Sequence, residues 1–413
     1  MRLVDRLPFL VVIVLMFSVI HVSAQVIDEV LFPVPYETNE GRLIGYINAN
    51  GEVVLPAIFS AGRPFAGGSA VVGTNRVSWA PTDFGVIDSS GQFFLPPNYE
   101  DVIMTERRNA WVLQQGSWSY IRTDNGKFVF ERTFDRVAPY SEGKAIVEYS
   151  KAQWAINEQG EEVFSLSSQN LFAILLKHGN VDAFPVGVAQ YRDDRLLVIA
   201  GQPAAGLRTI VFLDGEGEVA IPARTYLAGG INPFSQGYAA LQEPAPGKIG
   251  GGEAFFIDRH GERAFGGRVW RGVKSFSEGL AAVSTLSASP SQHRPARWGF
   301  IDRNGEMVIE DIYWDVEPFS EGLAAVAVEL DSLVPGNRDG LWGAIDQNGV
   351  MVIEPQFRSP FRFRDGLAQL FEPYEIHSIA GVQLSGPIRG TTMRYIDRNG
   401  RTVWDERDHR PVD

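Results

Sequence analysis

The sequence predicts an all-β protein in which tandem β-hairpin repeats form a β-propeller-like ring, with an open β-solenoid as the alternative. Three observations support this prediction. Apolar residues recur at every second position, as at Trp298 and Phe300 before one turn and Met307 and Ile309 after it, which is the period of a strand. Turns of the type Asp-x-x-Gly or Asn-x-x-Gly recur along the chain. A second motif, best developed as Phe-Ser-Glu-Gly-Leu-Ala-Ala-Val at 319–326, follows most of these turns.

The first 24 residues have the features of a secretory signal peptide. Arg2 and Arg6 precede an uncharged, apolar run over 7–20, and the small residues Ser23 and Ala24 follow, which predicts cleavage between Ala24 and Gln25. The alternative is a retained membrane anchor, but the run is shorter than the roughly 20 residues that a spanning helix needs. We therefore expect a secreted or periplasmic protein with no stable membrane insertion after cleavage.

Composition narrows the classes of function. The chain has no cysteine, which excludes a disulfide framework and a cysteine nucleophile. It has 37 basic and 50 acidic residues, a net charge of −13. Nucleic acid is not an expected partner, because phosphate binding requires clustered Lys and Arg. We expect the acidity to serve a well-solvated surface.

After a strand segment over 25–39, the repeat array spans 40–405 as about eight full units plus a terminal half unit, and 406–413 form a tail. The glycines that close the turns are 34 to 57 residues apart: Gly51, Gly91, Gly126, Gly160, Gly217, Gly261, Gly305, Gly349 and Gly400. Such a period indicates one supersecondary unit per step plus a loop of variable length.

The turn motif itself predicts a hairpin with a bulge. Asp accepts hydrogen bonds from backbone amides two residues on, and the closing Gly takes a positive φ without steric cost. In the third copy, Thr123 or Asp124 takes the place of this Asp. In the turn that Gly305 closes, the side chain of Arg303 is expected to face solvent. A calcium site is the rival interpretation, but calcium loops place several oxygen ligands within about a dozen residues, whereas these turns supply one Asp per unit.

The second motif predicts a flexible polar turn at Ser-Glu-Gly and a short buried strand at Leu-Ala-Ala-Val. Small alanines suit strands that are crowded near the axis of a closed assembly. The copies begin at Phe276, Phe319, Phe363, Tyr140 and Phe234, and Phe65-Ala66-Gly67-Gly68 and Phe184-Pro185-Val186-Gly187 are eroded versions.

The clearest copies of the first motif are Trp298-Gly299-Phe300-Ile301-Asp302 and Trp342-Gly343-Ala344-Ile345-Asp346, and a copy of the second motif follows each. The first and second motifs together resemble the repeat of the WG (KWG) repeat family. The resemblance covers nearly all of 40–405. The Trp-Gly pair is eroded to Phe84-Gly85, Trp118-Ser119 or Trp154-Ala155 in other units. The resemblance implies interaction or structural modules rather than enzymes.

Closure of the ring is the least determined feature. The last unit, 394–404, contains only the first hairpin, and we expect 26–35 to supply the missing strands, so that the two ends seal the ring. An open solenoid with irregular end units is compatible with the same number of repeats. A further insert over 165–182 contains the apolar run Leu171 to Leu176, which is expected to form a short helix.

The expected function is that of an exported, non-catalytic repeat scaffold that binds a protein or another ligand through its inter-repeat loops. Length variation follows the Leu-Ala-Ala-Val strand, and insertions at one point of each repeat map to one face. Aromatic and Arg side chains in these loops are the candidate contacts: Trp79, Arg294, Arg297, Arg338 and Tyr374.

No catalytic, cofactor-binding or metal-ligating residues are predicted, because the sequence contains no His-Glu-x-x-His pair, no Gly-x-Ser-x-Gly elbow and no phosphate-binding loop. The expected partner is an unknown protein or a glycan. The alternatives are a carbohydrate-binding module and a cryptic glycoside hydrolase, whose two carboxylates need not be close in sequence.

Overall fold

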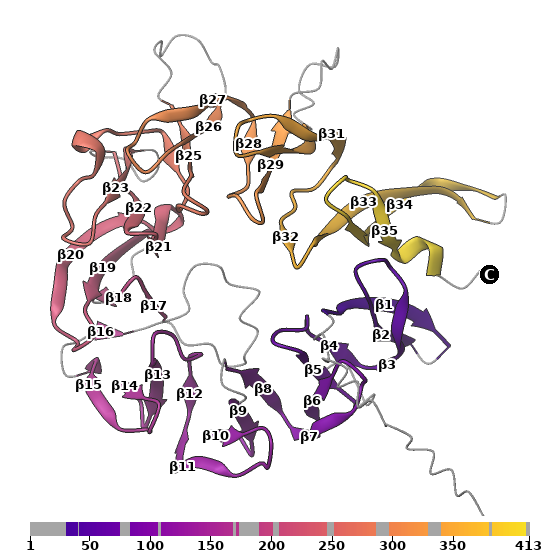
Figure 1. Ribbon diagram of the computed structural model, residues 1–413, viewed down its shortest axis with the longest axis horizontal. Helices are drawn as coiled ribbons and strands as arrows, with labels where there is room; N and C mark the ends of the chain where they lie inside the picture. The colour runs from indigo at the N-terminus through magenta and orange to yellow at the C-terminus, as the bar shows by residue number, and fades with distance from the viewer. Residues whose placement is uncertain are drawn as a thin grey trace, which may run out of the picture.

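The computed structural model describes residues 30–39, 41–74, 83–105, 109–167, 171–172, 190–200, 206–245, 252–285, 297–328, 340–379 and 382–409. Its strands form nine small antiparallel sheets that stand side by side in a ring (Figure 1). We number these sheets as blades 1 to 9 along the chain. In most blades the first strand lies nearest the centre and the last strand lies at the rim (Figure 1). The all-β fold and the propeller ring are thus confirmed, and the open solenoid is excluded.

The first five blades contain β1 to β20. Blade 1 has three strands, β1 (Phe32–Thr38), β2 (Gly41–Ile47) and β3 (Val53–Phe59). Blade 2 contains β4 (Ala61–Gly62), β5 (Ser69–Gly73), β6 (Phe84–Asp88) and β7 (Phe93–Tyr99), and blade 3 contains β8 (Asp101–Met104), β9 (Asn109–Gln114), β10 (Ser117–Arg122) and β11 (Phe128–Phe134). Blade 4 contains β12 (Arg136–Val137), β13 (Lys144–Tyr149), β14 (Ala152–Asn157) and β15 (Glu162–Ser165). Blade 5 contains β16 (Leu171–Phe172), β17 (Tyr191–Arg192), β18 (Arg195–Ala200), β19 (Leu207–Leu213) and β20 (Val219–Leu227).

The remaining blades follow the same plan. Blade 6 contains β21 (Ile231–Ser235), β22 (Tyr238–Gln242) and β23 (Ala254–Ile257), with the 3-10 helices η3 (Ala228–Gly230) before it and η4 (Phe265–Gly267) after it. Blade 7 contains β24 (Gly272–Val273), β25 (Ala281–Ser284), β26 (Trp298–Ile301) and β27 (Met307–Tyr313), and blade 8 contains β28 (Asp315–Val316), β29 (Leu323–Val328), β30 (Leu341–Asp346) and β31 (Met351–Phe357). Blade 9 contains β32 (Phe363–Arg364), β33 (Leu367–Ile379), β34 (Val382–Ile396) and β35 (Thr402–Asp405), and η5 (Glu406–His409) follows it.

Each sequence unit is divided between two blades. The Trp298 motif forms β26 and β27, the outer strands of blade 7, whereas the Phe319 motif that follows it forms the inner part of blade 8. The Leu-Ala-Ala-Val segment becomes β29, the second strand from the axis, in which Ala324 and Val326 are fully buried. Because every unit crosses a blade boundary, neighbouring blades share a covalent repeat as well as a packed interface.

The turn glycines provide a repeated contact between blades. All nine have a positive φ, between 67° and 88°. A Cβ added to eight of them would meet a side chain or the backbone of the outer part of the preceding blade, as at Gly305, where it would lie 2.6 Å from Cγ of Phe265 in η4. The exception is Gly126, which has no neighbouring atom within 4 Å. Seven of these contacts are made by the residue four positions after the preceding turn glycine: Leu55, Phe130, Phe164, Ile221, Phe265, Ile309 and Ile353.

Glycine is required in the Trp-Gly pair for a different reason. In Gly299 and Gly343 the φ angle is not positive, but an added Cβ would lie 2.4 Å from the Ile309 carbonyl oxygen or 2.3 Å from that of Ile353. The pairing of the last two strands shifts register at this point, so the outer strand crosses close over the glycine. Close backbone approach therefore explains why Gly follows Trp in these repeats.

The two ends of the chain meet by packing and not by exchanging strands. Blade 1 is β1-β2-β3 and blade 9 is β32-β33-β34-β35. The segment expected to supply the strands that the last unit lacks provides β1, from Phe32 on, as the inner strand of blade 1, and 26–29 lie outside the described residues. Blade 9 obtains its inner strands from the motif at Phe363. The interface contains an edge contact between Phe32 and Tyr395, with ring centroids 5.5 Å apart, and a hydrogen bond of 3.2 Å from Tyr395 to the Pro33 carbonyl.

The closing interface also repeats the glycine contact. A Cβ at Gly51 of blade 1 would lie 2.4 Å from the carbonyl oxygen of Val403 in blade 9. After β35, η5 packs against β1, and Arg42 forms an ion pair of 3.2 Å with Glu406. The ring is therefore closed by the same kind of packing that joins consecutive blades.

Most of the described residues of the insert over 165–182 are in β-strands. Leu171 and Phe172 pair with β18 as strand β16, so the predicted helix is wrong at these two residues, and 173–176 lie outside the described residues. The signal segment 1–24 also lies outside them. Among the residues described, no helix is long and apolar enough to cross a membrane.

Candidate functional site

The blade topology separates the ring into two faces. In a four-stranded antiparallel blade, the turn between the first two strands and the turn between the last two leave at the same end. We call this the turn face. The loops between the second and third strands and the connections to the next blade leave at the opposite end, which we call the loop face.

On the turn face, the inner turns are hydrogen-bonded from blade to blade. The third residue of each turn has a positive φ, and its side chain accepts a hydrogen bond from the backbone N–H of the fourth residue in the next blade's turn. The five pairs are Asp194 N to Glu142 Oε2 at 2.9 Å, Gly237 N to Asp193 Oδ2 at 2.6 Å, Gly279 N to Gln236 Oε1 at 2.9 Å, Gly322 N to Glu278 Oε2 at 2.8 Å, and Gly366 N to Glu321 Oε2 at 3.0 Å. This ladder joins blades 4 to 9.

The serines of the same turns add a second set of bonds. Ser277 Oγ donates to the Phe319 carbonyl of the next blade at 2.6 Å, and Ser235 Oγ donates to that of Phe276 at 2.7 Å. The predicted turn at Ser-Glu-Gly is present, but its polar side chains connect blades and do not form a free, flexible surface. Sequence reasoning missed this role, because the partner of each side chain lies about 44 residues away.

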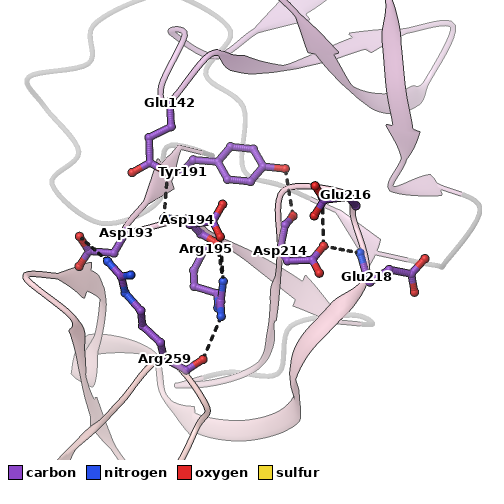
Figure 2. Close-up of polar contacts among 9 residues, drawn as sticks. All are labelled: Glu142, Tyr191, Asp193, Asp194, Arg195, Asp214, Glu216, Glu218 and Arg259. Carbon is purple, nitrogen blue, oxygen red and sulfur yellow. Dashed lines mark hydrogen bonds and ion pairs between the residues drawn. The ribbon is translucent and has the colours of Figure 1, made fainter.

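Figure 2 shows the ladder bond between Glu142 of blade 4 and Asp194 of blade 5, with Arg259 of blade 6 beside Asp193. In blade 5 the inner turn is Tyr191-Arg192-Asp193-Asp194, with Asp194 at a φ of 60° in the position of the glycine. The predicted copy at 184–187 lies outside the described residues. Burial, followed by the charge of Asp214, raises the pKa of Tyr191 above its usual range. Its hydroxyl therefore stays protonated and donates to the Asp214 carbonyl at 3.4 Å (Figure 2).

The outer turns reach back to the inner turns of the preceding blade. Arg259 approaches Asp193 at 3.6 Å (Figure 2), and Arg398 Nη2 donates to the Glu321 carbonyl at 2.6 Å. Arg303 Nη2 donates to the Gln236 carbonyl at 3.0 Å. The expectation that Arg303 only faces solvent is therefore wrong, since its guanidinium spans two blades.

The Asp residues of the outer turns act as predicted. Asp302 Oδ1 accepts from the backbone N–H groups of Asn304 and Glu306, both at 2.9 Å. The bond from Glu306 is the main reason why the pKa of Asp302 lies below its usual value. The third copy differs, because its Gly126 N–H donates to the Arg122 carbonyl and Asn125 Oδ1 accepts from the Lys127 N–H.

The loop face carries the length variation of the repeats. Six of the long connections join a second strand to a third strand, namely β5–β6, β18–β19, β22–β23, β25–β26, β29–β30 and β33–β34. The β33–β34 hairpin projects beyond the ring (Figure 1). Since antiparallel topology puts all these connections at one end of the blades, the insertions lie on one face.

Two of the five predicted contact residues can be placed. The Arg297 guanidinium carbon lies 4.6 Å from the ring centroid of Trp314, at the loop-face end of blade 7. Tyr374 lies on β33, half-buried, with its ring over Gly390 of β34. The two residues belong to different blades. Trp79, Arg294 and Arg338 lie outside the described residues.

Two cavities open between the inner strands. The larger, of about 790 Å³, which we call the axial cavity, extends from Arg192 of blade 5 along blades 6 and 7 to Arg362 before β32. The second, of about 630 Å³, lies where the ring closes, between Phe65, Phe361 and β1. Glu317 and Arg362 line both cavities and form an ion pair of 2.8 Å. Sequence reasoning missed both, because their linings come from blades far apart in the chain.

The structure also shows the surroundings of two histidines. The backbone of His260 belongs to the Asp258 turn, and the His409 ring stacks on Trp404 at a centroid distance of 5.2 Å. Within the described ranges, no group of three or more His, Asp or Glu residues is arranged to hold a metal ion. Neither histidine lines the axial cavity.

Solved structures resemble the chain only weakly. They include a eukaryotic initiation factor, with 10% identity, a TM-score of 0.47 and coverage of 92% of this chain and 95% of that chain. Another is apo AztD from Citrobacter koseri, with 12% identity, a TM-score of 0.35 and coverage of 91% and 93%. These scores are too low for either protein to inform the function of this chain. No curated protein matches its sequence.

The family comparison agrees with the repeat seen in the structure. A family model described as WG containing repeat matches residues 44–75, 84–106, 118–150, 298–329 and 342–370. Every match begins in an outer hairpin and ends in the inner strands of the next blade, which is the unit that the structure divides between blades. The chain therefore contains WG repeats, which the family model matches in these five segments.

Proposed function

We propose that this WG-repeat ring is an exported, non-catalytic scaffold that binds a partner protein through its loop face. The observation behind this proposal is the unequal use of the two faces. Ladder bonds and arginine bridges occupy the side chains of the turn face in blades 4 to 9. The loop face carries the long, variable connections, and binding residues in proteins are concentrated on loops held by a rigid scaffold.

The chemistry around the cavities favours binding over hydrolysis. A glycoside hydrolase needs one carboxyl group as a general acid and a second as a base or nucleophile. Glu317 and Asp365 line the second cavity, of about 630 Å³, but Glu317 pairs with Arg362 at 2.8 Å and Asp365 lies 3.7 Å from Arg364. Such ion pairs favour a structural role for both carboxylates.

A glycan partner is the second candidate. Tyr149 at the β13–β14 hairpin and Phe371 on β33 are about half exposed, at 49% and 55%. Exposed aromatic rings provide flat apolar surfaces on which sugar rings can stack. An array of neutral and acidic glycans tests this alternative, and loss of binding in Tyr149→Ala and Phe371→Ala variants would favour it over a protein partner.

Export is part of the proposal and rests on Arg2, Arg6, the apolar run and the small residues before Gln25. The N-terminus of the protein recovered outside the cytoplasm should be Gln25 by mass spectrometry. Recovery of an intact Met1 in the membrane fraction would contradict cleavage.

Site-specific photocross-linking tests the partner surface. A photoreactive amino acid replaces Arg297 or Tyr374 on the loop-face side, and Asn304 or Asn348 in the outer turns serves as the matched control. The proposal predicts cross-links to a partner protein from Arg297 or Tyr374 and none from the control positions. Cross-links from the turn face alone, or from no position, would overturn it.

A further inference from the structure

We propose that the axial cavity binds a small ligand that carries at least two oxyanion groups. The cavity measures about 790 Å³, within the range of small-molecule sites. Its charged lining consists of Arg192, Arg271, Lys274, Arg362 and Glu317. This site lies along the inner strands of blades 6 and 7 and does not depend on the partner surface proposed for the loop face.

The sign of the lining charge is opposite to that of the whole protein. Four cationic side chains face one carboxylate in the cavity, whereas the chain carries a net charge of −13. A concave wall of one sign concentrates the field and attracts ions of the other sign. An acidic protein that collects cations around a cavity is thus suited to an anion there.

The state of pairing identifies the cations that remain available. Arg362 pairs with Glu317 at 2.8 Å, and Lys274 Nζ lies 2.9 Å from Asp315 Oδ1 of blade 8. Arg192 and Arg271 differ, because no carboxylate of the described residues lies within ion-pair distance of either guanidinium. As far as the described residues go, neither guanidinium has a carboxylate partner, and each has the geometry to form bidentate bonds with an oxyanion.

The ring brings these cations together from distant parts of the chain. Arg192 occupies the position in the inner turn of blade 5 where blades 6 and 7 have the bonded serines Ser235 and Ser277. Arg271 comes directly before β24 of blade 7. Because the two arginines belong to blades 5 and 7, one oxyanion group for each is the simplest match, which is why we infer at least two.

The remaining wall supplies an aromatic surface. Trp298 lines the cavity, and the Lys274 ammonium lies 5.1 Å from its ring centroid. A Cβ at Gly272 would lie 2.8 Å from Cη2 of Trp298, so only glycine leaves room for the indole in this position. An indole beside cations suits a ligand with a flat apolar face as well as charged groups, such as an acidic sugar, whereas a phosphate compound would use the cations alone.

Isothermal titration calorimetry on the full mature chain tests the proposal. The probes are trigalacturonate for carboxylates, inorganic pyrophosphate for phosphates, and neutral cellotriose as the control. The variants are Arg192→Gln and Arg271→Gln. Arg401→Gln is the matched control, because it removes the same charge from an exposed outer turn that is not part of the cavity lining.

We expect at least one anionic probe to bind, with its affinity reduced about ten-fold or more in Arg192→Gln and Arg271→Gln and unchanged in Arg401→Gln. Binding of trigalacturonate alone identifies an acidic sugar, and binding of pyrophosphate alone identifies a phosphate compound. The proposal fails if neither probe binds at millimolar concentration, if cellotriose binds equally well, or if Arg401→Gln weakens binding as much as the cavity variants.

Discussion

Substituting alanine for a turn glycine should have two separable costs, one from backbone conformation and one from packing between blades. Gly126 and Gly305 both have a positive φ, of 67° and 82°. Around Gly126 the space is open, whereas a Cβ at Gly305 would lie 2.6 Å from Cγ of Phe265. The two glycines therefore share the conformational cost, and only Gly305 adds a steric one.

The expected magnitudes follow from these distances. A non-glycine residue in the left-handed region costs about 1–2 kcal/mol, which is the whole penalty predicted for Gly126→Ala. Gly305→Ala also overpacks the blade 6–7 interface, which adds about 1–3 kcal/mol. We therefore expect Gly305→Ala to lower the free energy of unfolding by about 2–5 kcal/mol.

Urea unfolding of the two variants measures the difference, and a double-mutant cycle assigns it. In a Phe265→Ala background, the cost of Gly305→Ala should fall part of the way toward that of Gly126→Ala, because Cγ and Cδ1 of Phe265 are gone while its Cβ, 2.8 Å from the added Cβ, remains. Equal destabilisation by the two glycine substitutions would refute the packing argument. So would a Gly305→Ala penalty that Phe265→Ala leaves unchanged.

Three further predictions use the same assay. Glu278→Ala removes the acceptor of the Gly322 N–H and should cost about 1–3 kcal/mol, whereas Glu278→Gln should be nearly neutral, since Gln236 makes the same bond in blade 6; equal costs would contradict the ladder. Gly343→Ala should destabilise although its φ is not positive, because the Cβ would lie 2.3 Å from the Ile353 carbonyl oxygen, and a neutral result would contradict the close crossing. Burial acts to raise the pKa of Asp405, but hydrogen bonds from Arg407 hold the pKa well below its usual value. The free energy of unfolding of the wild type should therefore exceed that of Asp405→Asn by its full amount at pH 7, and the difference should shrink as the pH falls below about 4. A difference that does not change with pH would contradict this.

Most of the local structure of the blades could be predicted from the sequence. Apolar alternation around Trp298 and the glycine at Gly305 defined a hairpin correctly, since strand period and positive φ are local properties. The inner turn of blade 5 was harder to find, because Asp194 takes a left-handed conformation without being glycine. Asp tolerates that conformation better than most residues, so the turn keeps its geometry although its residues differ from those of the motif.

The contacts between blades could not be predicted, because they depend on how the ring closes. The guanidinium of Arg303 reaches a carbonyl in a different repeat, 67 residues earlier in the chain. Arg192 and Arg271 line one cavity although 79 residues separate them. No local pattern encodes such proximities. The ladder and the axial cavity therefore became visible only in the assembled ring.

Closure of the ring is the central claim, and an intramolecular cross-link tests it most directly. The chain has no cysteine, so Arg42→Cys in blade 1 and Asp408→Cys in η5 can be joined by a short bismaleimide without competition. The native Arg42 and Glu406 side chains approach to 3.2 Å across this junction. Arg42→Cys with Asn304→Cys of blade 7 is the control pair. We predict a cross-linked monomer from the first pair and none from the control. Failure of the first pair to link within one molecule, or equal linking of both pairs, would contradict a closed nine-bladed ring.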